Sequence, residues 1–136
     1  MLQPQYNLVE RDFERTLLPV AEHWDLAVLP YFALAKGFLT GKYRPGAAAV
    51  ESPRASAARG YLEKGGAAVL EALDEVAAAH EATVAAVALA WLRARPRVTA
   101  PIASARTTEQ LEQILPAATL ELTPAEMDRL TPAGAA

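Results

Sequence analysis

Few side chains in this sequence have the type and spacing that catalysis needs. The 136 residues contain no cysteine, which excludes thiol catalysis, disulfides and thiolate metal sites. The two histidines, His23 and His80, belong to separate predicted helices with no second ligand nearby, so no metal site is expected. Lys42 and Tyr43 are neighbours in a loop, and that spacing does not make a proton relay. Arg106 stands beside a predicted helix N-terminus, an arrangement that favours phosphate.

Composition indicates an ordinary globular domain. The chain is 52% hydrophobic and 21% charged, with a net charge of −3. Its length predicts one domain, residues 1–136, that buries roughly two-thirds of its surface. The acidic excess and the scattered arginines argue against nucleic acid as a partner. The absence of cysteine, of an export signal and of an apolar run near ~20 residues predicts a cytoplasmic protein with no membrane segment.

Hydrophobic periodicity predicts strands that alternate with helices. Short apolar runs typical of buried parallel strands occupy residues 2–9, 26–31 and 98–103. Helical spacing predicts helices over residues 13–23, 66–79, 83–93 and 107–114, and a last short helix after residue 123. The region 44–58, rich in proline, glycine, serine and alanine, predicts a long surface loop.

Polar residues mark where these helices begin. N-caps are predicted at Asp12, at Thr83 and at either Thr107 or Thr108. Thr123, Pro124 and Glu126 match a capping box with proline at the first helical position. We expect Trp91 and the Val/Leu stripe around it to lie in the core.

The order of elements predicts an α/β fold with a parallel sheet. A complete (β/α)8 TIM barrel has eight strands and needs about 250 residues. The chain is therefore expected to form a partial barrel, equivalent to the C-terminal half, with about three parallel strands and outer helices.

Four strings, in order along nearly the whole chain, resemble the aldo-keto reductases. They are LQPQYNLVER at residues 2–11, VLPY with LAKGFLTGKY between residues 28 and 43, VALAWL at residues 87–92, and ART with EQL between residues 105 and 111. The resemblance implies a (β/α)8 barrel that this chain enters at the sixth strand. It also implies NADPH-dependent reduction of aldehydes or ketones.

The resemblance further implies a cofactor site. The matching positions are Gln3, Tyr31, Leu34, Gly37, Ser104, Arg106 and Gln110. Tyr31 would offer a flat surface to the nicotinamide ring, and Gln3 would hydrogen-bond its carboxamide. The loop from residue 34 to 41 would pass beneath the pyrophosphate, where glycines allow close approach. The segment around Arg106 would contact the 2′-phosphate and adenine.

The catalytic Asp, Tyr, Lys and His of the family precede the sixth strand, so no residue here matches them. Hydride delivery leaves an alkoxide that a general acid must protonate. We therefore assign no catalytic residue and expect the isolated chain to be inactive. Phe32 and Ala33 also stand where the family commonly has Ser and Pro, and Gln113 with Ile114 replaces an acidic-Asn pair.

A half-barrel would expose the unpaired edges of its outer strands. Either a second copy of the chain, as a homodimer, or a complementary N-terminal half-barrel would cover them. Three interpretations stay open: an inactive portion of an oxidoreductase, a non-catalytic nucleotide-binding module, and a subunit that completes a split barrel.

Overall fold

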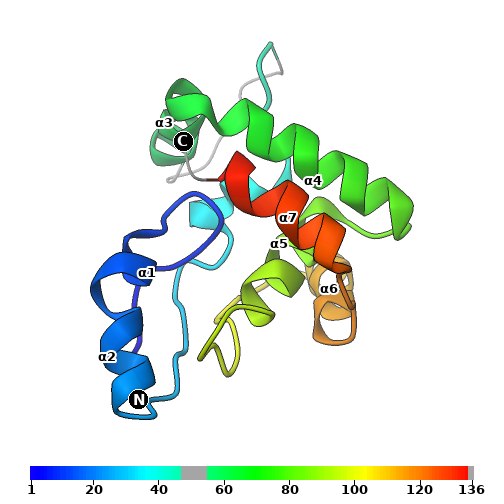
Figure 1. Cartoon of the computed structure of the whole chain (residues 1–136). Helices are drawn as coiled ribbons and strands as arrows, with labels where there is room; N and C mark the ends of the chain where they lie inside the picture. The colour runs from blue at the N-terminus through cyan, green and yellow to red at the C-terminus, as the bar shows by residue number, and fades with distance from the viewer. Residues whose placement is uncertain (47–54, 135–136) are drawn as a thin grey trace.

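Helices dominate the computed structural model, which describes residues 1–46 and 55–134 (Figure 1). The α-helices are α1 Asp12–Thr16, α2 Leu18–His23, α3 Ala55–Tyr61, α4 Ala67–Ala79, α5 Val84–Arg93, α6 Thr108–Ile114 and α7 Pro124–Ala133. Two elements are 3-10 helices, η1 Ala35–Thr40 and η3 Leu115–Ala118, and one is a π-helix, η2 Leu62–Gly66. In Figure 1, α1 and α2 lie at one side of the molecule and α6 lies at the opposite side.

Three extended segments, residues 2–5, 27–31 and 97–102, lie where the sequence predicts strands. They pair in parallel through isolated bridges that join Leu2 to Val28, Gln5 to Tyr31 and Val28 to Val98. No continuous strand forms among the described residues, so the prediction of regular strands is wrong, although the pairing is parallel as expected. The segments carry prolines at positions 4, 30 and 101, and a proline has no N–H to donate to a ladder.

The helix predicted over residues 13–23 is broken into α1 and α2. Leu17 separates the two at φ −112° and ψ −21°. Pro19, in the first turn of α2, lacks the N–H that a continuous helix would bond to the preceding turn. The prediction of Asp12 as N-cap is also wrong: Arg11 occupies the cap position and makes no side-chain cap bond. The Asp12 carboxylate instead pairs with Arg15 at 3.0 Å.

The other helix starts agree with the sequence. The hydroxyls of the N-cap threonines accept hydrogen bonds from Ala86 N in α5, Gln110 N in α6 and Glu126 N in α7. Thr123 and Glu126 form both halves of the predicted capping box. The loop prediction over residues 44–58 is wrong at its end, where α3 begins at Ala55 and buries Ala55, Ala58 and Tyr61. Residues 47–54 of that prediction lie outside the described residues.

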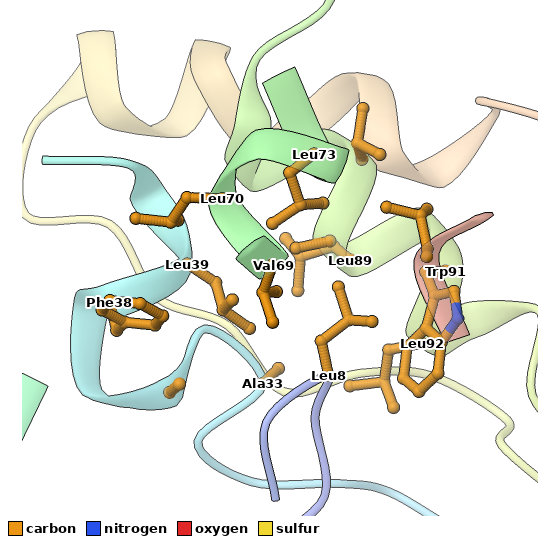
Figure 2. Close-up of a cluster of buried hydrophobic side chains, with 14 of the residues drawn as sticks. Leu8, Ala33, Phe38, Leu39, Val69, Leu70, Leu73, Leu89, Trp91 and Leu92 are labelled. Carbon is orange, nitrogen blue, oxygen red and sulfur yellow. The ribbon is translucent and has the colours of Figure 1, made fainter. Parts of the chain in front are cut away.

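The core forms where α4, α5 and α7 pack against the N-terminal segment (Figure 2). Every residue of α5 from Ala85 to Leu92 is buried, and Trp91 is fully buried, as predicted. Leu8, Phe38 and Leu73 reach the same cluster from three separate elements. The apolar faces of distant parts of the chain therefore meet on α5.

A partly buried ionic network ties the N-terminal segment to α5. Glu14 accepts hydrogen bonds from Tyr6 at 2.6 Å, from Arg11 at 2.7 and 3.0 Å and from Arg95 at 3.2 Å. The two arginines lie 5.6 and 5.0 Å from the centre of the Trp91 ring. Burial opposes ionisation of Glu14, but the hydrogen bonds from Arg11 and Tyr6 outweigh it and hold the pKa of Glu14 below its ordinary value.

The described helices are short compared with the roughly 20 residues that cross a bilayer. Within residues 1–46 and 55–134, no single helix is long and apolar enough to cross a membrane. Two helical stretches, residues 55–79 and 84–93, reach that length and hydropathy when taken together, and they are bent by 96° at the break between them.

Candidate functional site

A cleft of about 540 Å³ lies between two loops that follow extended segments. One wall is the region from Tyr31 to Lys42, after the middle segment, and the other runs from Ile102 to Ile114. The lining includes six of the seven predicted cofactor positions, namely Tyr31, Leu34, Gly37, Ser104, Arg106 and Gln110. The structure thus brings together two groups of residues about seventy positions apart in the sequence.

The first wall is a loop held in an uncommon backbone conformation. Phe32, Ala35 and Lys36 have φ values of 51°, 48° and 58°, and Gly37 has 96°. Left-handed backbone is unfavourable for side chains with a Cβ, and such strain concentrates at functional sites. Two backbone bonds maintain it: Ala35 N donates to Phe32 O at 2.7 Å, and Gly37 N donates to Leu34 O at 2.8 Å.

Asn7 supports this loop from below. It is the polar side chain that is completely buried among the described residues. Its Nδ2 donates to Phe32 O at 2.9 Å, and its Oδ1 accepts from Val9 N and Glu10 N, both at 3.0 Å. The amide fixes the carbonyl of a residue with positive φ next to Tyr31. Sequence reasoning missed this role, because only the contact with Phe32, far along the chain, reveals it.

Arg44 fastens the other end of the first wall. Its guanidinium makes two bonds to the Asp74 carboxylate of α4, at 2.5 and 2.8 Å. Its Nε also donates to Gly41 O at 2.9 Å. Gly41 is left-handed, with φ 78°. The loop is therefore anchored to the helical core after the last lining residue of this wall.

The second wall is more open to solvent. Ser104, Arg106 and Gln110 are exposed or partly exposed there. The Gln110 Oε1 accepts from Arg106 N at 2.9 Å, and Gln110 N donates to the cap hydroxyl of Thr107 at 3.3 Å. The Arg106 guanidinium itself forms no ion pair with any described residue.

The charges on the cleft are all positive. Lys36, Lys42 and Arg106 line it, and its described lining contains no carboxylate. Neither lysine has an ion-pair partner among the described residues; the two ammonium groups lie 5.4 and 5.2 Å from the rings of Phe32 and Tyr43. Sequence reasoning did not assign either lysine to the site. Each lysine is next to a glycine in the sequence, Lys36 before Gly37 and Lys42 after Gly41, and that pairing was the signal in the sequence that could have identified them.

The aromatic surface of the cleft is Tyr31. Its side chain is 38% exposed, although it follows a buried segment. Its ring meets Phe32 edge-on, with 5.1 Å between centroids. Gln3, the remaining predicted residue, is exposed on the first extended segment and is absent from the cleft lining. The cleft thus offers an aromatic face and three cations that form no ion pair with a described residue, which suits a ligand with an aromatic ring and phosphates.

The described residues contain no cluster of side chains suited to a metal ion. Among residues 1–46 and 55–134, no three His, Asp or Glu side chains are grouped closely enough to hold a metal ion. His80 instead pairs with Glu126 at 2.8 Å, between the end of α4 and the start of α7.

Comparisons with known proteins agree in one family. A probable aryl-alcohol dehydrogenase of Saccharomyces cerevisiae is 29% identical, covering 94% of this chain and 40% of its own length. An uncharacterized oxidoreductase of Mycobacterium tuberculosis is 36% identical, over 98% of this chain and 42% of its own. The solved glycerol dehydrogenase of Gluconobacter oxydans matches with a TM-score of 0.80 and 26% identity, over 96% of this chain and 41% of its own.

The chain therefore spans about two-fifths of the relatives that it matches. The model of the aldo/keto reductase family matches residues 1–134. A match of that extent establishes descent, and the chain belongs to the aldo/keto reductase family.

Proposed function

We propose that this chain is the NADPH-binding, C-terminal portion of a (β/α)8 oxidoreductase that acts on aldehydes or ketones. The cleft carries the proposal. It joins Tyr31, Gly37 and Arg106 with the two lysines of the same loop, and no described lining residue is acidic. Parallel pairing of the three extended segments supports the partial barrel.

The residues present fit this cofactor. Tyr31 exposes a ring face on which a nicotinamide can stack. Lys36 and Lys42 stand beside Gly37, where the absence of a Cβ lets a pyrophosphate approach. Arg106 supplies a fork of donors for a 2′-phosphate on the second wall. Bound NADPH would supply the hydride that reduces a carbonyl carbon.

The proposal does not give this portion the proton transfer. The catalytic Asp, Tyr, Lys and His of the family match no residue of this chain, so we assign protonation of the alkoxide to groups outside it. We infer that the chain binds and orients the cofactor and that turnover needs groups outside it. A nucleotide-binding module without catalysis would use the same cleft. An assay of turnover in the presence of a polypeptide that carries the family's catalytic residues separates the two functions.

Titration of the chain with NADPH and NADH tests the cofactor site. We expect the emission of reduced nicotinamide to change with a saturating, weak affinity, and NADPH to bind more tightly than NADH. Hydrogen bonds to charged groups contribute roughly 1.5–3 kcal/mol, so Arg106→Gln should weaken NADPH at least about tenfold and leave NADH almost unchanged. Arg15→Gln, which removes an exposed arginine of α1, is the matched control. No change at millimolar NADPH would refute the proposal.

A further inference from the structure

A second cavity, of about 210 Å³, lies where three distant parts of the chain meet. Its walls are the turn at residues 9–10, the π-helix η2 with the residues around it, and the end of α7 (Figure 1). No described residue lines both this cavity and the cleft between Tyr31 and Arg106. Pockets for drug-sized ligands measure roughly 300–1,000 Å³, so this cavity fits a smaller molecule of few heavy atoms.

A carboxylate is held in place at one wall of the cavity. Glu10 Oε1 accepts a hydrogen bond from Tyr61 OH at 3.0 Å, and Glu10 Oε2 makes no hydrogen bond with a described residue. The backbone of Glu10 is fixed by Asn7, whose Oδ1 and carbonyl oxygen both accept from Glu10 N, at 3.0 and 3.3 Å. Burial and the bond to Glu10 raise the pKa of Tyr61, so the phenol keeps its proton and remains a donor. The cavity therefore presents one carboxylate oxygen that can accept from a ligand.

A cation lines the same cavity from a different element. Lys64 belongs to η2, where it departs from helical geometry at φ −96° and ψ 26° and is followed by the left-handed Gly65 at φ 85°. Single turns of π-helix are rare and occur frequently at functional sites. Lys64 is exposed and forms no ion pair with Glu10 or with any other described residue. Two opposite charges thus line one small cavity without neutralising each other.

The rest of the lining is aliphatic or has no side chain. Val9, Val69 and Ala133 supply the apolar surface, and the other lining residues are glycines. Val69 is buried, so the apolar wall belongs to the packed part of the molecule. Such a wall gains free energy from a small aliphatic group and offers no polar partner to it.

We propose that this cavity binds a free α-amino acid with a small aliphatic side chain. The ammonium group would donate to Glu10 Oε2, the carboxylate would pair with Lys64, and the side chain would pack on the two valines. An α-amino acid carries both charges on adjacent carbons, so one small molecule satisfies both groups of the cavity. A ligand with a single charge would leave either Glu10 or Lys64 without a partner.

Titration of the isotope-labelled chain with L-valine, followed by heteronuclear NMR, tests the site. The amide signals of Gly65 and Gly66 should shift in a saturable way at neutral pH, because both glycines line the cavity. Isobutylamine and isovalerate keep the side chain of valine and only one of its charges. Each should bind at least about tenfold more weakly, since each lacks one hydrogen bond between charged groups. The titration needs no NADPH, so its outcome is independent of the cofactor site.

Substitutions of the two charged residues make the test specific. Glu10→Gln and Lys64→Gln should each weaken valine at least about tenfold. Glu63→Gln is the matched control: it removes an exposed charge of the same π-helix that does not line the cavity, and it should leave valine binding unchanged. Circular dichroism shows whether the variants stay folded. Because Lys64 is exposed, Lys64→Gln decides the outcome even if Glu10→Gln disturbs the turn.

Three results would overturn the proposal. They are the absence of saturable shifts with valine, equal binding of isobutylamine or isovalerate, and an unchanged affinity for valine in Lys64→Gln.

Discussion

Asn7 illustrates how a single buried amide can set the shape of a ligand site. It satisfies three backbone groups, two in its own turn and one on Phe32 across the chain. Phe32 keeps a left-handed backbone beside the aromatic face of Tyr31. The geometry of the cleft thus depends on a residue that never faces it.

Replacement of Asn7 should therefore cost considerable stability. Asn7→Ala leaves Val9 N without its partner and removes one of the two hydrogen bonds made by Glu10 N and by Phe32 O. An unsatisfied buried polar group costs about 1–3 kcal/mol, so we expect the free energy of unfolding to fall by about 1–3 kcal/mol in chemical denaturation. Gln3→Ala removes an exposed amide and should change it by less than about 0.5 kcal/mol. Equal losses in the two variants would contradict the role assigned to Asn7.

Glu14 predicts how stability responds to acid. Hydrogen bonds from Arg11 and Tyr6 lower the pKa of Glu14 in the folded chain despite partial burial. The unfolded chain therefore binds more protons, and stability decreases as the pH falls. This contribution is present above the ordinary pKa of 4.5 and is lost as the pH falls through the lower, folded value.

The substitution Glu14→Gln should flatten that acid limb. Denaturation midpoints measured from neutral pH down to acid should fall less steeply for this variant than for the unmodified chain. Glu22→Gln, at an exposed position of α2 with no ion pair among the described residues, should keep the original slope. If both variants keep the slope, another group controls the acid response.

Helices were predictable from local signals and the strands were not. The caps at Thr83, Thr107 and Thr123 follow from a hydroxyl that reaches the next turn, a contact within three residues. The break at Leu17 depends on the missing N–H of Pro19, a signal present in the sequence but outweighed by helical periodicity. The extended segments depend on partners far along the chain, which periodicity does not contain.

The same division holds for the cleft. Family resemblance named six residues that line one cavity, because strings at the ends of the extended segments carry them. It did not include Lys36, whose backbone is left-handed, or the anchor from Arg44 to Asp74. Those features depend on the path of the loop and on α4, which lies about thirty positions further on.

The junction of η2 and α4 provides a sharp test of packing. A Cβ on Gly66 would lie 2.5 Å from Tyr61 O and 2.6 Å from Phe38 Cζ. Overpacking of this kind costs about 1–3 kcal/mol, so Gly66→Ala should lower the thermal midpoint clearly. Gly60 in α3 has open space around it, and Gly60→Ala should stabilise the chain by about 0.5–1 kcal/mol. The opposite order of midpoints would show that Phe38 and Tyr61 do not pack against Gly66 as described.

The molecule as a whole presents a positively charged cleft with an aromatic face, and no residue of the chain matches the catalytic set of its family. The lining favours the nucleotide proposed above, and the chain spans about two-fifths of the oxidoreductases it matches. General acid catalysis contributes typically 10²–10⁴-fold to such reactions. We therefore expect this chain to bind NADPH without catalysing turnover.

Assays of NADPH oxidation should show that separation. With an aldehyde substrate, the isolated chain should not exceed the buffer rate, because no residue of the chain matches the catalytic Tyr and Lys of the family. Addition of the part of the Mycobacterium tuberculosis oxidoreductase that lies outside its match to this chain should produce turnover, and Tyr31→Ala in this chain should then slow it, since the stacking surface for the nicotinamide is lost. Leu62→Ala, in η2 away from the cleft, controls for general destabilisation. Turnover by the isolated chain would place the proton source inside residues 1–136 and refute the division of roles proposed here.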